Sequence, residues 1–215
     1  MKLKCFPIVL LPLLFAFPAN ANTCSSQEAS VKVTPTYYGY SVHRTVDRSG
    51  LERLRNAPVE KGMEIMGLTV GGLSYQMKLS VGITGTRGSG YCGSAKSLEV
   101  LYGTDEPVKV FIAPNVKVGS CEDRTTMEHE LRHVGFIEQA IREGGVLIES
   151  SLKRELRGKT FTGRDEEAVS SSVKEFATGI IQREFSKVSS KLDAQNASID
   201  TRESYSATAA RCSNR

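Results

Sequence analysis

The sequence predicts an α+β fold, with a small antiparallel sheet followed by a helical half. Residues 31–113 contain several short stretches in which apolar and polar residues alternate, the pattern of half-buried strands. Residues 123–192 instead carry apolar residues at helical spacing. We expect one domain over residues 22–215, closed by a polar tail over residues 193–215, because this length suits a single hydrophobic core.

The first residues have the three-part layout of a secretory signal peptide. Lys2 and Lys4 give a positive start, residues 6–17 form an apolar run that is too short to span a bilayer, and Ala19-Asn20-Ala21 is a small-x-small cleavage site. We therefore expect residues 1–21 to be removed and the protein to be periplasmic or secreted. No later stretch is long and apolar enough to predict a membrane span.

Four cysteines remain once Cys5 is removed with the signal peptide. An even number of cysteines in an exported chain predicts two disulfides. Three pairings are possible and the sequence does not choose among them; our working expectation is Cys92–Cys121 together with Cys24–Cys212, which would tie both ends to the body. A zinc-thiolate site is not expected, because no C-x-x-C spacing occurs.

The strand-rich half divides into five candidate strands and one short helix. The clearest strand covers residues 73–81, where apolar and polar residues alternate without interruption. Gly-rich turns separate the candidates, notably at residues 85–93. The other strands are expected at residues 31–34, 37–42, 97–102 and 108–113, and the helix near residues 49–56.

Three helices are expected in the second half. The first should begin near residues 123–126, where Asp and Thr can cap it, and end at Gly144-Gly145. The second should cover residues 146–156 and end at Gly158, and the third should cover residues 165–188. The tail is polar, yet it carries Cys212, so we expect its end to be tethered.

The first of these helices carries an H-E-x-x-H motif at residues 129–133. Two histidines four residues apart lie one turn apart on the same helix face, so both imidazoles can reach one metal ion. Zinc held in this way lowers the pKa of a coordinated water to about 7, and a neighbouring glutamate can accept its proton. We therefore predict one zinc ion bound by His129 and His133, with Glu130 as the general base.

A catalytic zinc site needs a third protein ligand, and the sequence leaves its identity open. No third histidine follows the motif, and Glu138 projects away from the histidine face of the helix. Glu166 and Glu167 at the start of the third helix are candidates, as is Glu149. The remaining histidine, His43, lies on an expected strand, where a packed or surface role is expected.

The order of these features resembles a bacterial family of unknown function described as predicted secreted zinc-dependent proteases. Members begin with a Tyr-Tyr segment and a short helix, matched here by residues 37–42 and 50–54, followed by a turn and a strand, matched by residues 57–59 and 67–69. A strand, a cysteine, a strand ending in proline and H-E-x-G-H on a helix come next, matched by residues 73–81, Cys92, 110–114 and 129–133. The resemblance implies a zincin-like fold and proteolytic activity.

Two residues depart from that family pattern. Arg132 replaces the small residue that usually precedes the second histidine. Members close with a segment like Tyr-Asp-x-x-Thr-x-His-Gly, and residues 199–205 resemble a diverged copy in which Tyr205 stands where the family has a histidine. The resemblance thus makes Tyr205 a further candidate, either as a phenolate ligand or as a hydrogen-bond donor to the transition state, unless the site is degenerate.

Two functions follow from these observations. The first is an exported zinc-dependent peptidase that hydrolyses peptide bonds of a polypeptide substrate by metal-activated water. The alternative is a non-catalytic periplasmic or secreted binding or structural protein with a degenerate zincin-like site. A nucleic-acid partner is not expected, because the net charge of +4 falls to +2 without Lys2 and Lys4 and the basic residues are scattered among acids.

Overall fold

The computed structural model describes residues 24, 26, 28–55 and 65–213. The predicted signal peptide over residues 1–21 and the turn at residues 57–59 lie outside these described residues. Among the helices of the described part, none combines the length and the apolar character that a membrane crossing requires.

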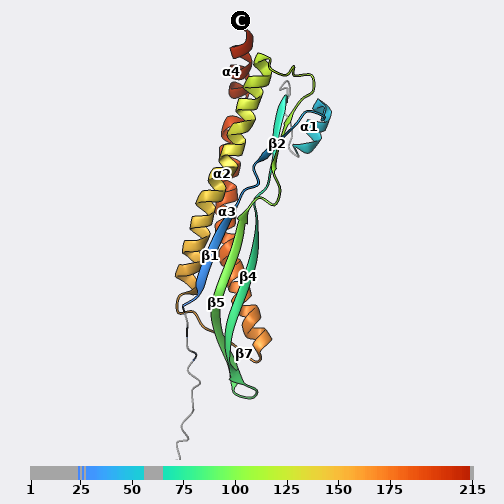
Figure 1. The fold of residues 1–215 in the computed structure, drawn as a ribbon. Helices are drawn as coiled ribbons and strands as arrows, with labels where there is room; N and C mark the ends of the chain where they lie inside the picture. Colours follow the sequence, from blue (N-terminus) through green and yellow to red (C-terminus); the bar gives the residue numbers. More distant parts are fainter. Residues whose placement is uncertain (1–23, 25, 27, 56–64, 214–215) are drawn as a thin grey trace, which may run out of the picture.

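The predicted α+β class is confirmed, with the strands gathered in two small sheets ahead of long helices (Figure 1). The first sheet has the order β1-β5-β4, with β7 also paired to β5, and the second has the order β2-β6-β3. Both sheets are mixed rather than purely antiparallel, because β1 runs parallel to β5 and β2 parallel to β6. The strands are β1 Ser30–Thr36, β2 Tyr40–His43, β3 Gly67–Val70, β4 Ser74–Thr86, β5 Gly90–Gly103, β6 Val108–Ile112 and β7 Phe161–Gly163.

The turn expected in the Gly-rich stretch at residues 85–93 is present but short, because only residues 87–89 separate β4 from β5. β4 and β5 pair through it as one long antiparallel hairpin, whose last pair joins Thr86 to Gly90. A side chain at Gly85 would collide with the backbone of Gly90, so the glycine permits close strand approach rather than ending the strand.

The first two predicted helices form one continuous helix, α2, from Cys121 to Leu156. Ser120 caps its start by accepting a hydrogen bond from the Asp123 backbone N–H at 3.2 Å. The predicted break at Gly144-Gly145 is wrong for a packing reason: a Cβ at Gly144 would collide with the hydroxyl of buried Tyr102. The glycine therefore admits a strand side chain against the helix instead of ending the helix.

The third predicted helix is longer than expected, and the tail is helical. Helix α3 runs from Glu166 to Ile199, capped by Asp165, which accepts a hydrogen bond from the Ala168 N–H at 2.8 Å. The expected polar tail over residues 193–215 instead contains the end of α3 and a further helix, α4, from Arg202 to Ser213. The short helix predicted near residues 49–56 is α1, from Arg48 to Leu54.

The expected disulfide pairing is wrong. Cys24 is bonded to Cys92 on β5, and Cys121 at the start of α2 is bonded to Cys212 on α4. Both ends of the described chain are tethered as expected, but to the body of the fold rather than to each other. The expectation failed because cysteine spacing carries no information on which elements pack together.

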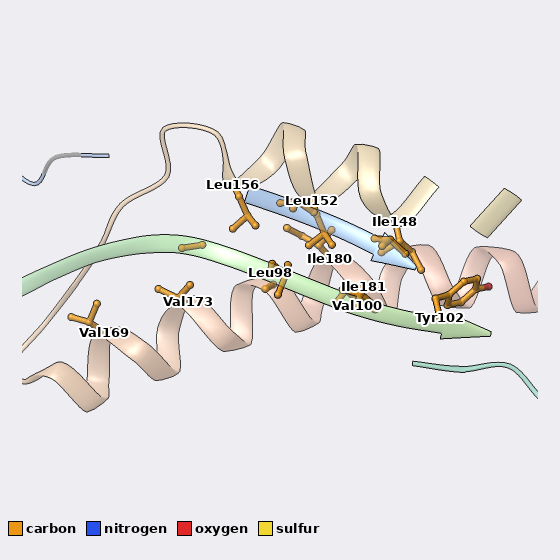
Figure 2. Close-up of a cluster of buried hydrophobic side chains, with 14 residues drawn as sticks. Leu98, Val100, Tyr102, Ile148, Leu152, Leu156, Val169, Val173, Ile180 and Ile181 are labelled. Atoms are coloured by element: carbon orange, nitrogen blue, oxygen red, sulfur yellow. The ribbon is translucent and has the colours of Figure 1, made fainter. Parts of the chain in front are cut away.

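Two apolar clusters hold the sheets against the helices. In the first, Leu98 and Val100 of β5 pack in one cluster with Leu152 of α2 and with Ile180 and Ile181 of α3 (Figure 2). In the second, the buried face of β6, made of Val108, Val110 and Ile112, packs on α2 and the end of α3. Helices α2 and α3 span both clusters, and the start of α2 meets the end of α3 beside the second sheet.

Candidate metal centre

His129 and His133 lie on the buried face of α2, where the predicted spacing places them together. Both residues are buried, and their ring centroids are 5.0 Å apart. The Nε2 atoms of the two rings lie only 3.2 Å from each other. The sequence-based expectation that both imidazoles can reach one ion therefore agrees with the observed geometry.

The carboxylate of Asp200 completes the cluster. Asp200 is the C-cap residue of α3, and its Oδ1 lies 3.1 Å from the Nε2 of His129 and 3.1 Å from that of His133. These three side chains form a group that could hold a metal ion. Neither the H-E-x-x-H spacing nor any local pattern pointed to this aspartate as a ligand.

The spacing of the three donor atoms fits a metal ion. A tetrahedral ion with bonds of about 2.0–2.1 Å holds its ligand atoms about 3.3 Å apart, and the three observed separations are 3.2, 3.1 and 3.1 Å. Three atoms that each offer a lone pair repel one another at this distance unless a proton or a cation lies between them. The same separations also fit hydrogen bonds from protonated rings to the carboxylate, so the arrangement is one that could hold a metal ion.

Asn196 fixes the orientation of one of the rings. Its Oδ1 accepts a hydrogen bond from Nδ1 of His133 at 2.8 Å, which leaves Nε2 of that ring free to bind a metal. Asn196 and Asp200 are four residues apart on α3, so they repeat on this helix the spacing of the two histidines on α2. Nδ1 of His129, by contrast, is buried and has no hydrogen-bond partner among the described protein atoms.

The charges in the cluster are strongly coupled. Burial by itself would raise the pKa of Asp200, but hydrogen bonds from His129 and His133 hold that pKa well below its usual range. Burial likewise lowers the pKa of His133, but its hydrogen bonds to Asp200 and Asn196 outweigh burial and raise the pKa above its usual value. The site therefore favours an ionised aspartate with positive charge beside it.

Glu130 lies next to the cluster, as predicted, and is held by the second sheet. It is buried, and its Oε2 accepts a hydrogen bond from the Thr69 hydroxyl of β3 at 2.8 Å. Burial raises the pKa of Glu130, while the Thr69 hydrogen bond and the nearby histidines lower it in part. Gly67 makes room for this carboxylate, because a Cβ there would lie 2.6 Å from Oε1 of Glu130.

Tyr205 of α4 also reaches the site, although not in the place of a third ligand. Its hydroxyl donates a hydrogen bond to Oδ1 of Asp200 at 3.0 Å, and its ring lies 5.0 Å from that of His129 between centroids. Burial and the neighbouring negative charges of Asp200 and Glu130 raise the pKa of Tyr205, so the phenol keeps its proton. In this arrangement Tyr205 is a hydrogen-bond donor to the aspartate.

The other carboxylates proposed from the sequence lie far from the cluster. Glu166 and Glu167 begin α3, whose 34 residues place them about 50 Å from Asp200 at the usual helical rise. Glu149 accepts a hydrogen bond from the Val33 backbone and pairs with Lys153 instead. Glu138 pairs with Arg142, as its orientation away from the histidine face predicts. His43 packs against Phe111 on the second sheet.

Two cavities meet at this site. One has a volume of about 430 Å³ and the other about 490 Å³, and both are lined by Gly67, Glu130 and Tyr205. The first extends between α2 and α4, and the second extends toward the end of α3 and Arg55. Glu130 therefore borders two cavities, and each is large enough to hold part of a ligand.

Comparisons of the chain with protein-family models, with curated proteins and with solved structures find no match. The resemblance to predicted secreted zinc-dependent proteases thus stays a prediction, and the site is interpreted from its own geometry.

Proposed function

We propose that this protein is an exported zinc-dependent peptidase, which hydrolyses peptide bonds of a polypeptide substrate. The observation that carries the proposal is the meeting of His129, His133 and Asp200 at one point beside the buried carboxylate of Glu130, where two cavities join. A zincin-like site needs these parts: three protein ligands, a general base and space for the substrate.

Zinc is the metal that best suits this donor set. Two imidazole nitrogens and one carboxylate oxygen form a ligand set typical of catalytic zinc, with a fourth position left for water or substrate. One zinc ion held there would supply a Lewis acid that polarises a peptide carbonyl and makes water more acidic.

The chain's own residues would then act as follows. Glu130 accepts a proton from the attacking water and later delivers it to the leaving amine nitrogen. The Thr69 hydroxyl, through its 2.8 Å hydrogen bond, holds the Glu130 carboxylate in place. Asn196 keeps the His133 ring turned with Nε2 toward the metal position. The phenol of Tyr205 lines both cavities and holds the Asp200 carboxylate through its 3.0 Å hydrogen bond.

The position of β3 supports a polypeptide as the substrate. This strand pairs with β6 on one side and, within the described part of the chain, with no strand on the other. Its first residue, Gly67, lines both cavities, so this strand begins beside Glu130. An extended peptide can add to such an edge through backbone hydrogen bonds.

The two disulfides are consistent with an oxidising extracellular compartment. Together with the predicted signal peptide they support export to the periplasm or beyond the cell. The alternative is a non-catalytic protein with a degenerate site. No third histidine follows the motif, but the Asp200 carboxylate offers a ligand in place of one.

The deciding experiment compares the wild type with Glu130→Gln. We expect both proteins to contain about one zinc ion per chain, and the variant to hydrolyse an unfolded polypeptide such as denatured casein at least about 100-fold more slowly. Glu138→Gln, on the same helix but turned away from the site, should retain both zinc and activity. An active Glu130→Gln protein would overturn the mechanism, and a zinc-loaded wild type without hydrolysis would favour the non-catalytic alternative.

A further inference from the structure

Helix α4 forms one wall of the site without being anchored by an apolar core. None of its described side chains is buried, and its most shielded residues, Ser204, Tyr205 and Cys212, are only partly covered. Most of its residues are polar or small, and Arg202 and Glu203 lie in its first turn. A helix of this length is marginally stable by itself in water, so its position must come from specific attachments.

The attachments of α4 to the rest of the described chain include a hydrogen bond, an ion pair and a disulfide. Tyr205 donates its hydrogen bond to Asp200 near the start of the helix. Arg211 forms an ion pair with Glu128 of α2 at 2.9 Å, but both side chains are more than half exposed, and exposed pairs contribute little. The third attachment is the Cys121–Cys212 disulfide, which bonds the far end of α4 to the first residue of α2.

The cavity of about 430 Å³ exists because α4 stands in this place. Tyr205, Ser206, Ala209 and Cys212 of α4 form one side of it, and His129 and Glu130 of α2 form another. A helix displaced from α2 would leave this space open to solvent on that side. The disulfide therefore lies in the wall of the cavity that adjoins the candidate metal centre.

Next to Glu130 and His129, apolar groups line this cavity together with the uncharged hydroxyls of Thr126, Ser206 and Ser213. Met66, Gly67 and Ala209 contribute no polar side-chain group. The hydroxyl of Thr125 is engaged within α2, where it donates to the backbone carbonyl of Cys121 at 3.0 Å. Apart from Glu130, the charged lining residues are Glu122 in the first turn of α2 and Arg202 in the first turn of α4.

We propose that this cavity is the subsite for an apolar side chain of the substrate, and that the Cys121–Cys212 disulfide holds α4 in place as its wall. The proposal rests on the peptidase function proposed above, because the cavity owes its position next to the scissile bond to His129 and Glu130. Its volume is within the range of sites that enclose small organic groups. The occupant is thus a bulky aliphatic or aromatic side chain.

The subsite is tested with two probes that differ only in the side chain. The hydroxamates of leucine and of glycine both bind zinc through the same group, and their affinities for the zinc-loaded protein can be measured by titration calorimetry. We expect the leucine compound to bind at least about tenfold more tightly. Ala209→Trp, which fills the cavity, should abolish this preference, whereas Ala207→Trp on the same helix, outside the lining, should retain it.

The role of the disulfide is tested by hydrogen exchange of the α4 backbone. In the double variant Cys121→Ser/Cys212→Ser, residues 202–213 should exchange at least about tenfold faster, and the leucine preference should disappear. The matched control is Cys24→Ser/Cys92→Ser, which removes the disulfide of the first sheet. It should leave both α4 exchange and leucine preference unchanged, and both double variants should still bind one zinc ion.

The outcomes separate the two parts of the proposal from the proposed function. Unchanged α4 exchange in Cys121→Ser/Cys212→Ser would overturn the role of the disulfide. An equal affinity of the two hydroxamates for the wild type, or an undiminished preference in Ala209→Trp, would overturn the subsite. Failure of every version to bind zinc would overturn the peptidase function and the subsite with it, while the exchange measurement still decides how α4 is held.

Discussion

Asp200 shows how one residue outside any local motif can complete a site. It lies one position beyond α3, where its backbone N–H still donates to the carbonyl of Asn196 at 3.1 Å. Helical geometry therefore continues long enough to place both side chains on the face that meets α2. Asn196 and Asp200 together make hydrogen bonds to both histidines of the motif.

Removal of the Asp200 charge should weaken metal binding. Asp200→Asn keeps the size of the side chain, but the neutral amide no longer balances a divalent ion. Loss of a partner beyond the ligands costs about 10–100-fold in metal affinity, so loss of a direct ligand should cost at least about 100-fold. Competition with a chromophoric zinc chelator measures the affinity.

The matched control for this change is Asp193→Asn, an exposed residue two turns earlier on α3. It lines the second cavity but does not belong to the His129, His133 and Asp200 group. Its zinc affinity should equal that of the wild type. Equal affinities of the Asp200→Asn and wild-type proteins would show that the aspartate is not a ligand.

At the scale of single elements, helix α2 both carries the residues of the site and packs against the first sheet. Its first half carries the motif, and its second half packs against the first sheet through Ile148 and Leu152. The helix continues through Gly144, which lies against the Tyr102 ring at a place where no larger residue fits. A glycine pair ends a helix only when the residues that follow cannot continue it, and residues 146–156 can.

Gly144→Ala should destabilise the protein although alanine is the better helix former. The added Cβ collides with the hydroxyl of Tyr102, which is fully buried, so that helix and strand must separate. Overpacking of this kind costs about 1–3 kcal/mol in the free energy of unfolding. Urea denaturation followed by circular dichroism measures the change.

Gly135→Ala on the same helix provides the opposite expectation. A Cβ at Gly135 meets nothing within 4 Å, so the substitution should stabilise the protein by about 0.5–1 kcal/mol through helix propensity. A stabilising effect of both substitutions would contradict the close contact between Tyr102 and α2.

At the scale of the whole molecule, two long helices running in opposite directions bring distant segments together. The start of α2 meets the end of α3 at the candidate metal centre, and the chain between them turns through β7 at the other end of the molecule (Figure 1). Midway, Glu184 of α3 is only 2% exposed and accepts hydrogen bonds from Lys187 at 2.9 Å and Arg183 at 3.1 Å. Arg183 in turn bonds to Glu155 of α2 at 2.7 Å, which connects the two helices.

Glu184→Gln should lower the free energy of unfolding at pH 7 by about 1–3 kcal/mol, because charge-assisted hydrogen bonds become weaker neutral ones in a buried place. The wild-type contribution depends on pH in a defined direction. The hydrogen bond from Lys187, followed by that from Arg183, holds the pKa of Glu184 below its ordinary value of 4.5. The unfolded chain therefore binds the proton more readily than the folded protein.

This stabilisation is complete above about pH 4.5 and is lost as the pH falls through the lower pKa of the folded state. Wild-type stability should accordingly decline more steeply in acid than that of Glu184→Gln, as measured by denaturation at a series of pH values. The exposed Glu175→Gln on the same helix serves as the control and should leave the profile unchanged. Parallel profiles for wild type and Glu184→Gln would contradict the depressed pKa.

Most elements could be predicted from the sequence, but their lengths and partners could not. Alternation identified residues 73–81 as a strand, yet β4 continues to Thr86 because the glycines that follow pair closely with β5. Helix α3 continues past the predicted end at residue 188 to Ile199, although residues 189–199 lack a strong apolar pattern, because its last turns pack at the site. The ends of β4 and α3 therefore depend on tertiary contacts of glycines and polar residues, which a local sequence pattern does not reveal.

The sequence by itself determined a helical pair of histidines with a glutamate between them, because i and i+4 positions share a helix face whatever the rest of the chain does. Only the tertiary structure decided that Asp200, 71 residues from His129, faces both rings and that Cys121 bonds to Cys212. Both contacts form because the start of α2 lies next to the end of α3. The antiparallel packing of these two helices brings those ends together, and that packing depends on contacts along the whole length of the core.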